Sequence, residues 1–315
     1  MRFGIVKCHG SGNDFPMIDA REIELSAVEW ATVARALADR RGAVGGDGLL
    51  LLGKSLRSCD FSMAMFNSDG SEAETCLNGL RCVARMGFEA LGIDQARVAL
   101  KTSEALVERV PELAPGVYSV LETAGPASLD VAAWPMVGEA APLVERAIPR
   151  LPGERRFTAV AMPNPHLVAF VEAVDEDELV RVGEVCEAAP DWLPNRANVS
   201  FVEVRGNALF VRTFERGVGL TDSCGSAMAA STYAACLTGR IGWDRETVVL
   251  NRGGMVRARA GEDAMVSIAG NATYEWTGSV TVDLGSGTAG DLVIEAWRND
   301  EIAAWGAVAD EAAWG

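Results

Sequence analysis

Two widely separated cysteines occupy the same place in a repeated local pattern, each between a turn and a run of residues with helical character. Cys76 follows a turn-forming stretch at 67–70 and precedes an apolar run of helical period over 78–91, which Gly92 is expected to close as a C-cap. Cys224 follows a glycine-containing turn and precedes a run rich in alanine and serine over 227–237. This repeated order of strand, turn, cysteine and helix predicts two halves of similar architecture whose two thiols serve one site.

A thiol at the start of a helix is suited to acid–base chemistry. The helix dipole and the unpaired backbone N–H groups there favour the thiolate form. One thiolate would remove a proton from a carbon acid while the opposite thiol donates one to the other face, which inverts the centre without a cofactor. The first amides of each helix, at 77–79 and 225–227, would hold a carboxylate and stabilise the enolate-like charge that develops.

The other cysteines are expected to be buried, because a reduced cysteine behaves in most proteins as a small hydrophobic side chain. Seven cysteines are an odd number in a long chain, which favours reduced thiols over a disulfide framework. Cys76 and Cys82 lack metal-ligand spacing and neighbouring histidines, so we expect no metal site. Composition and spacing alone leave a regulatory disulfide between Cys76 and Cys224 as an alternative to catalysis.

The bulk composition indicates a globular protein of two domains. The chain has 315 residues, of which 49% are hydrophobic, enough for two cores. A formal net charge of −16 argues against a nucleic-acid partner, which requires a basic surface. Without an export signal or an apolar run of membrane-spanning length, we expect a cytoplasmic protein that does not bind membranes. None of the three lysines lies in a setting typical of a Schiff base, so we expect no pyridoxal cofactor.

The remaining pattern predicts many short strands and two further helices. The helices are expected at 26–41, where Ser26 and Glu29 form a capping box, and at 175–188. Strands are expected at 3–9, 15–19, 49–52, 60–66, 97–100, 105–110, 117–121, 156–162, 167–172, 199–205, 208–214, 247–250, 255–259, 264–268 and 272–282. A domain boundary is predicted near 124, and a glycine-rich linker at 285–290 is expected to lead into an acidic tail.

Seven motifs in series resemble those of the diaminopimelate epimerase family, whose members interconvert LL- and meso-diaminopimelate without a cofactor. They cover about residues 1–283 and are Gly10-Ser-Gly-Asn13-Asp-Phe, Asn67-Ser-Asp-Gly-Ser-Glu, Cys76-Leu-Asn-Gly-Leu-Arg-Cys, Asn164-Pro-His166, Asn195-Arg-Ala-Asn198-Val, Glu215-Arg216-Gly-Val-Gly and Cys224-Gly-Ser226. The family usually has glycine at the positions of Leu77 and Pro163, so this chain departs from the pattern twice.

The resemblance implies an α/β (α+β) fold of two similar domains, each a mostly antiparallel sheet curled around a central helix. The expected domains are 1–124 with about 272–284, then 125–271, followed by a tail at 285–315 of unknown role. The active site would lie in the cleft between the domains, with Cys76 and Cys224 as the catalytic acid and base. The residues implied to bind substrate are Asn13, Asn67, Leu77, Asn78, Asn164, Asn198, Glu215, Arg216, Gly225 and Ser226.

The implied activity is that of an isomerase that converts LL- to meso-diaminopimelate for lysine and peptidoglycan biosynthesis. The expected ligand is a small amino acid, with no cofactor and no metal, and a homodimer is one option for the assembly. Leu77 and Pro163 motivate one alternative, a racemase or epimerase of another amino acid on the same scaffold. A non-catalytic thiol redox or binding protein is the alternative from a different class.

Overall fold

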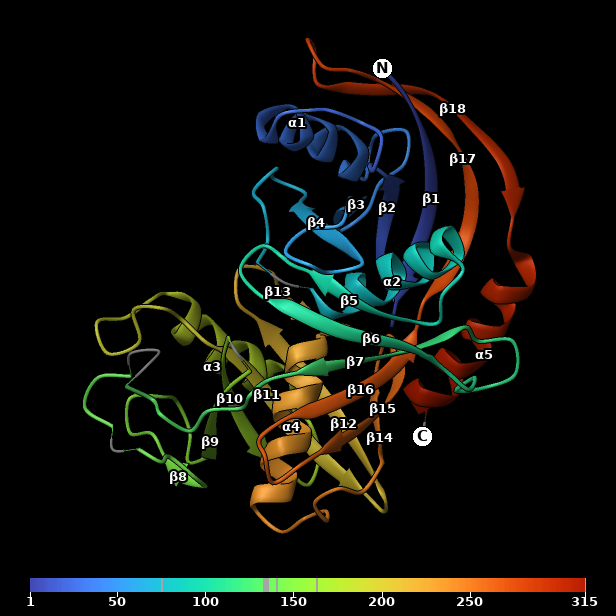
Figure 1. The fold of residues 1–315 in the computed structure, drawn as a ribbon. Coiled ribbons are helices and arrows are strands. Elements are labelled where there is room, and N and C mark those ends of the chain that lie inside the picture. The colour runs from blue at the N-terminus through green and yellow to red at the C-terminus, as the bar shows by residue number, and fades with distance from the viewer. Residues whose placement is uncertain (75, 133–135, 140, 163, 315) are drawn as a thin grey trace. The chain divides into compact units, whose positions relative to one another are not determined.

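The computed structural model describes residues 1–74, 76–132, 136–139, 141–162 and 164–314, which form two compact units (Figure 1). The first comprises Met1–Glu122 and Ala269–Val308, and the second comprises Thr123–Ile268 and Ala309–Gly315. The chain therefore passes from one unit to the other inside strands β7 (Ser119–Ala124) and β16 (Val266–Asn271), and again inside the last helix.

The first unit is a twisted, mostly antiparallel sheet in the order β18–β17–β1–β2–β3–β4–β5–β6–β7. Two neighbouring pairs are parallel, β2 with β3 and β4 with β5, and each is joined through a helix. The other strands are β1 (Arg2–Gly10), β2 (Asn13–Asp19), β3 (Gly48–Gly53), β4 (Phe61–Asn67), β5 (Gln95–Ala99), β6 (Glu104–Val110), β17 (Thr273–Asp283) and β18 (Thr288–Trp297).

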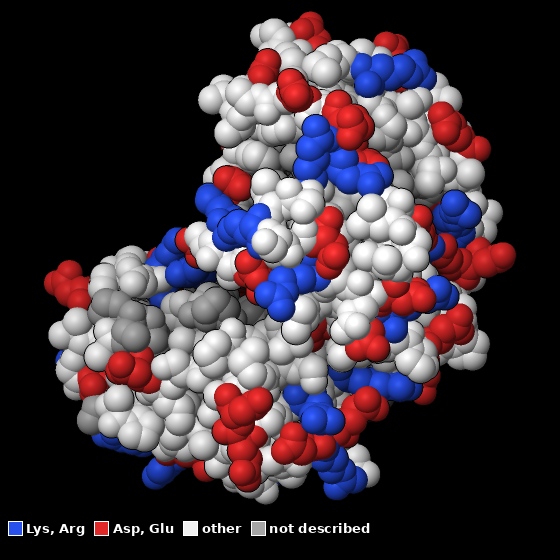
Figure 2. All heavy atoms as spheres, viewed as in Figure 1, with Lys and Arg blue, Asp and Glu red and all other residues white. Residues whose placement is uncertain are grey.

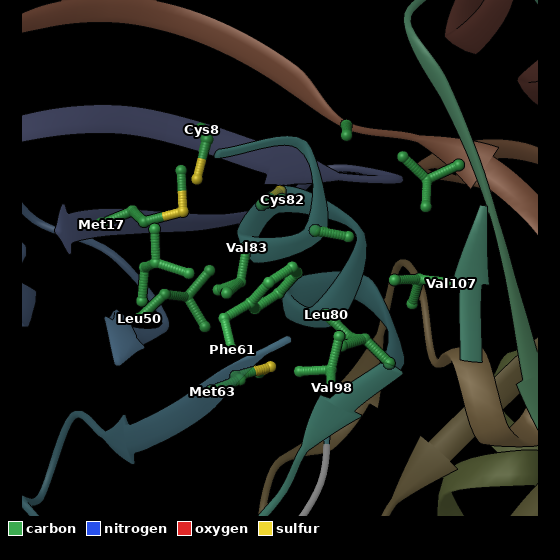
Figure 3. Packing of buried hydrophobic residues seen from close by; sticks show 14 of the residues in the cluster. Cys8, Met17, Leu50, Phe61, Met63, Leu80, Cys82, Val83, Val98 and Val107 are labelled. Atoms are coloured by element: carbon green, nitrogen blue, oxygen red, sulfur yellow. The ribbon is translucent and has the colours of Figure 1, made fainter. Parts of the chain in front are cut away.

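Helices cover both faces of this sheet, which is why the run Leu49–Leu52 is apolar at every position. Helix α2 (Leu77–Leu91) packs against strands β1 to β6. Its core cluster includes Leu50 (Figure 3) and also Leu52. Helix α1 (Ala27–Ala38) covers the other face, where Leu49 and Leu51 are buried. Because successive side chains of a strand alternate between faces, burial on both faces requires an unbroken apolar run.

The second unit repeats this design. Its pairs run antiparallel, parallel, antiparallel, parallel and antiparallel through β9–β10–β11–β12–β14–β15, as do β1–β2–β3–β4–β5–β6 in the first unit. The bounds are β8 (Arg146–Ala147), β9 (Arg156–Ala161), β10 (Pro165–Phe170), β11 (Asn198–Arg205), β12 (Ala208–Glu215), β13 (Gly219–Thr221), β14 (Thr247–Asn251) and β15 (Gly254–Ala260). Helices α3 (Glu176–Glu187) and α4 (Gly225–Leu237) occupy the places of α1 and α2.

The repeat confirms the predicted fold of two similar halves with a central helix in each. Helix α4 packs against β9, β10, β11, β12, β14 and β15, and its residues are buried from Gly225 to Cys236 apart from Ser226. Alanine and serine suit such a helix because they let strands approach it closely from all sides. The predicted caps are also present, since Ser26 and Glu29 form the capping box of α1 and Gly92 ends α2 with a left-handed φ of 70°.

The linker expected at 285–290 is wrong as a prediction. Strand β18 begins at Thr288 and pairs antiparallel with β17, so this glycine-containing stretch is the turn of a long hairpin. Gly287 has a φ of 68° and donates its N–H to the carbonyl of Asp283, as a tight turn requires. The segment that follows, α5 (Asn299–Trp314), is a helix whose first part belongs to the first unit.

Helix α5 is fixed to the first unit by an ion pair with α2. The Glu301 carboxylate accepts from Arg85 Nη1 at 2.5 Å and Nη2 at 2.9 Å, and it also accepts from the Tyr274 amide at 3.2 Å. The Arg85 guanidinium lies over the rings of Tyr274 and Tyr118 and is mostly buried. Trp305 adds a ring contact with His9 on β1 at 5.9 Å. These contacts give the C-terminal segment a structural role that its composition did not indicate.

Replacing Glu301 by glutamine should lower the free energy of unfolding by about 1.5–3 kcal/mol, the usual contribution of hydrogen bonds to charged groups. The carboxamide presents N–H donors to a guanidinium that also only donates, so Arg85 loses part of its bidentate partner. Urea unfolding followed by circular dichroism measures the change. Glu311→Gln on the exposed side of α5 is the matched control and should shift stability by less than about 0.5 kcal/mol.

On the face drawn in Figure 2, acidic and basic side chains lie interspersed. Surface arginines are paired with carboxylates, for example Arg21 with Asp19 at 2.7 Å and Arg196 with Glu187 at 2.6 Å. Within the described ranges, no helix is long and apolar enough to cross a membrane.

Candidate active site

Cys76 is the N-cap residue of α2, in an extended conformation with a φ of −151°. Its Sγ accepts the N–H of Gly79 at 3.3 Å, and its carbonyl accepts the first intrahelical bond, from Leu80, at 2.8 Å. The amides of Leu77 and Asn78 thus precede the first helical hydrogen bond, as predicted for a carboxylate-binding turn. The Gly79 amide, which was expected to join them, instead donates to the cysteine sulfur.

Gly79 also has a steric role beneath this turn. A Cβ at this position would lie 2.7 Å from Leu50 Cδ2 on β3 and 3.4 Å from the Cys76 sulfur. A larger residue would therefore push the first turn of α2 away from the sheet. The glycine allows the helix start, and with it the thiol, to sit directly against β3.

Two asparagines predicted as site residues meet beside Cys76. The Asn13 Oδ1 lies 3.8 Å from the Cys76 sulfur and 3.5 Å from the Asn78 Nδ2 that donates to it. The Asn13 Nδ2 donates to the Asp47 carboxylate at 2.5 Å. Asp47 was missed by sequence reasoning, because its role depends on the parallel pairing of β2 with β3, which no local motif reveals.

Asn67 and Leu77 complete the predicted residues of the first unit. Asn67 ends β4, and its Nδ2 donates to Ser71 Oγ at 3.0 Å, so in this structure its side chain serves the turn. Leu77 is the first residue of α2 and is half-buried. Pro163, the other departure from the family pattern, lies outside the described residues.

Cys224 is the N-cap of α4, the position equivalent to that of Cys76, with a φ of −133°. Its side chain is buried, and its Sγ lies 3.5 Å from Ser226 Oγ. Its carbonyl accepts the first intrahelical bond from Met228 at 3.0 Å, so the Gly225 and Ser226 amides again precede the helical ladder.

The remaining predicted residues of the second unit are linked through a histidine. Asn164 Nδ2 donates to Ser226 Oγ at 3.2 Å, and Asn164 Oδ1 lies 3.0 Å from His166 Nε2. The Asn198 Nδ2 lies 3.4 Å from the same ring nitrogen. Burial lowers the pKa of His166 to about 3, with a further lowering by Arg216, so its ring is neutral near pH 7. The Asn164-Pro-His166 motif was its only sequence signal.

Glu215 and Arg216 lie at the end of β12, where the chain turns toward β13. The Arg216 amide donates to Asn198 Oδ1 at 2.8 Å, and its Nη1 donates to the Asn195 carbonyl at 2.9 Å. Both Glu215 and Arg216 are half-buried. The structure therefore connects Cys224, through Ser226, Asn164, His166 and Asn198, to the backbone amide of Arg216, one of the two charged residues predicted to bind the distal end of the substrate.

The predicted residues thus form one cluster in each unit. In the first unit Asn13, Leu77 and Asn78 surround the start of α2, while Asn67 serves its own turn. In the second unit, a continuous chain of polar contacts joins Cys224, Ser226, Asn164, His166, Asn198 and the Arg216 amide. Each cluster has a thiol beside two amides at a helix start. The thiol can exchange a proton at a carbon next to a carboxylate, and the amides can bind that carboxylate.

Comparison with known proteins identifies the family. The family described as diaminopimelate epimerase matches residues 5–110 and 158–275. The diaminopimelate epimerase of Clostridium acetobutylicum is 38% identical over 290 residues, covering 90% of this chain and 87% of the relative. That of Enterococcus faecalis is 39% identical over 279 residues, covering 85% and 86%.

Solved structures share the fold at much lower identity. A phenazine biosynthesis protein of the PhzF family from Bacillus anthracis matches with a TM-score of 0.65 at 14% identity, covering 90% of this chain and all of that one. A hydroxyproline epimerase from Agrobacterium vitis matches with a TM-score of 0.63 at 13% identity, covering 90% and 92%. From the repeated fold, the two N-cap cysteines and these relatives, we conclude that the chain belongs to the diaminopimelate epimerase family.

Proposed function

We propose that this protein is an isomerase that converts LL-diaminopimelate to meso-diaminopimelate with two cysteines as acid and base. The observation that carries the proposal is the equivalence of Cys76 and Cys224. Each is the N-cap of the central helix in its unit. Along the chain, α2 lies between β4 and β5 and α4 lies between β12 and β14, and these two strand pairs are the equivalent parallel pairs of the two units. A two-base inversion requires a proton acceptor and a proton donor on opposite sides of one carbon, and two cysteines, one as thiolate and one as thiol, can fill both roles.

In the proposed reaction, one cysteine as thiolate takes the α-proton of the substrate, and the electron pair moves into the adjacent carboxylate. The other cysteine, as thiol, then donates its proton to the opposite face of the α-carbon. The inverted product leaves with the thiol and thiolate exchanged between the two residues. The amides of Leu77, Asn78, Gly225 and Ser226 would hold the carboxylate and stabilise its developing charge, so the residues of this chain supply all the chemistry.

Recognition of the distal end distinguishes diaminopimelate from simpler amino acids, because its far end carries a second carboxylate and ammonium. Arg216 would hold the carboxylate with a two-pronged guanidinium contact, and Glu215 would pair with the ammonium. Asn67, Asn164 and Asn198 would supply neutral hydrogen bonds to this end, and Asn13 would also line the site. Two bonds donated by Arg216 support this assignment: its amide donates to Asn198 Oδ1, which holds the turn, and its Nη1 donates to the Asn195 carbonyl, which orients the guanidinium.

The proposed setting is the cytoplasm, in lysine and peptidoglycan biosynthesis, with an amino acid as the ligand and a homodimer as an option for the assembly. The relatives named above support the pathway, and the composition favours a partner other than nucleic acid.

Exchange with solvent deuterium tests the substrate. In D2O with reductant present, the protein should exchange the α-proton of LL-diaminopimelate, read by NMR, and produce the meso form, read by chromatography. A panel of other amino acids is run in parallel, because Leu77 departs from the family pattern. Exchange of another amino acid but not of diaminopimelate would replace the proposal with a racemase of that compound, and absence of exchange throughout would favour the non-catalytic alternative.

A further inference from the structure

Arg81 is the largest fully buried side chain of the described residues, and it lies on α2 one turn beyond Asn78. Its Nη1 donates to Glu122 Oε1 at 2.6 Å, and neither side chain of this ion pair is exposed. Glu122 is the last residue of the first unit before the chain crosses to the second. A fully buried ion pair therefore lies close to the first turn of α2, which Cys76 caps.

The surrounding structure is built to hold the guanidinium in one orientation. Its Nε donates to the Asn271 carbonyl at 3.1 Å, and its Nη2 donates to Ser11 Oγ at 3.3 Å and to Asn78 Oδ1 at 2.7 Å. Gly270 leaves the space, because a Cβ there would lie 2.6 Å from Arg81 Cζ. Four directed bonds and a glycine that makes room indicate that the direction of each N–H group matters.

Stability alone does not account for this pair. Removing two charges from water costs free energy, and well-packed apolar residues of similar volume are often at least as stabilising as a buried ion pair. Burial raises the pKa of Glu122 to about 7 even beside Arg81. Among the described residues, Glu122 Oε2 has no hydrogen-bond partner. The Glu122 carboxylate is therefore poorly solvated, and its one hydrogen-bonded oxygen accepts from Arg81.

The bonds of Arg81 lead to the Cys76 thiol through two amide side chains. Because Arg81 can only donate, Asn78 must turn its Oδ1 toward the guanidinium and its Nδ2 toward Asn13. On the other side, the Asp47 carboxylate can only accept, so Asn13 must turn its Nδ2 toward Asp47. Both constraints leave the Asn13 Oδ1 facing the Cys76 sulfur, 3.8 Å away.

We propose that Arg81, oriented by Glu122, is a positioning residue for Cys76: it fixes the Asn78 and Asn13 amides so that an oxygen acceptor meets the thiol. This inference rests on the proposed function for its effect on turnover. It adds a residue that touches no substrate and that acts through two amide orientations. The Asp47 carboxylate completes the arrangement from the opposite end.

The first experiment compares Arg81→Met/Glu122→Gln, Asn78→Ala and their combination. The double variant removes both buried charges together, so neither is left unpaired. We expect kcat to fall about tenfold with KM changed by less than about threefold, since a misplaced acid–base group slows the chemical step. Asn78→Ala should give a similar loss, and the combined variant should lose no more than about twofold further, because both changes break the same path. Additive losses would overturn the proposal.

The second experiment measures the reactivity of the Cys76 thiol directly, in the absence of substrate. Iodoacetamide labelling followed by peptide mass spectrometry gives separate rates for Cys76 and Cys224. In the double variant and in Asn78→Ala, Cys76 should react at least about threefold faster, because its sulfur is no longer held between Asn13 and the Gly79 amide, while Cys224 keeps its rate. Unchanged labelling of Cys76 in Asn78→Ala, which leaves the ion pair intact, would overturn the proposal even if the double variant failed to fold.

Glu301→Gln is the matched control, because it weakens the hold on Arg85, a neighbouring arginine of the same helix whose guanidinium donates to Glu89, the Ala272 carbonyl and Glu301. It should leave the labelling rate of Cys76 and kcat unchanged although it lowers stability. If Glu301→Gln accelerates labelling of Cys76 as much as the double variant does, general loosening of α2 explains the effect and the positioning role is wrong. If the wild-type protein fails to epimerise diaminopimelate, the proposed function fails, while the labelling rates still decide the positioning role.

Discussion

Alanine at either Cys76 or Cys224 should reduce the epimerisation of diaminopimelate by about 10²–10⁴-fold, the usual cost of losing one positioned acid or base. Each cysteine is the N-cap of a central helix and lies beside helix-start amides, so each would exchange a proton at its own face of the α-carbon. Loss of either one leaves its own face of the α-carbon without a proton donor or acceptor, while the other face keeps its cysteine. Conversion of LL- to meso-diaminopimelate under steady-state conditions measures the loss.

The two helices supply their own controls. Cys82 on α2 and Cys236 on α4 are buried and lie within the same helices, so Cys82→Ala and Cys236→Ala test whether any cysteine loss there is damaging. These variants should keep kcat within about threefold of the wild-type value, apart from effects of lower stability. Serine at 76 or 224 is expected to retain some deuterium exchange from one face. More than about a hundredth of normal turnover in either alanine variant would contradict the two-base scheme.

Replacing Arg216 by lysine should lower kcat/KM for diaminopimelate by roughly 10- to 100-fold, although the charge is kept. Lysine carries a single ammonium and cannot reproduce the two parallel N–H bonds of a guanidinium to a carboxylate. The charge-assisted contact is worth about 1.5–3 kcal/mol, and about 1.4 kcal/mol corresponds to a tenfold change. The Asn195 carbonyl, which now orients Nη1, would lose its partner as well.

Arg196→Lys is the matched control for this prediction. Arg196 lies in the adjacent loop, is paired with Glu187 at 2.6 Å and is outside the predicted substrate set. Its replacement should leave kcat/KM for diaminopimelate within about twofold. If Arg216→Lys also left diaminopimelate kinetics unchanged, Arg216 would not bind the distal carboxylate, and a racemase of an amino acid without a second carboxylate would become the better reading.

The sequence by itself determined the features that depend on neighbouring residues. Ser26 and Glu29 predicted the capping box that starts α1, and Gly92 predicted the end of α2, because caps are formed within one helical turn. The same locality placed Cys76 and Cys224 at helix starts, where turn residues meet an apolar or small-residue run. The similarity of the two halves also followed from local order, although their residues barely match.

Only the tertiary structure decided the contacts between segments that are distant in the chain. The sequence predicted a linker and tail where strand β18 lies. A glycine-rich stretch has the same sequence whether or not the segment after it pairs with a neighbouring strand, as β18 does with β17. The sequence did not indicate Asp47 or Glu122 for a related reason. Asp47 binds Asn13, which is 34 positions away, and Glu122 binds Arg81, which is 41 positions away. A charged side chain that is unremarkable in its own segment gains its role only when folding brings a distant partner beside it, as Arg81 is brought to the buried Glu122 and Asn13 to the exposed Asp47.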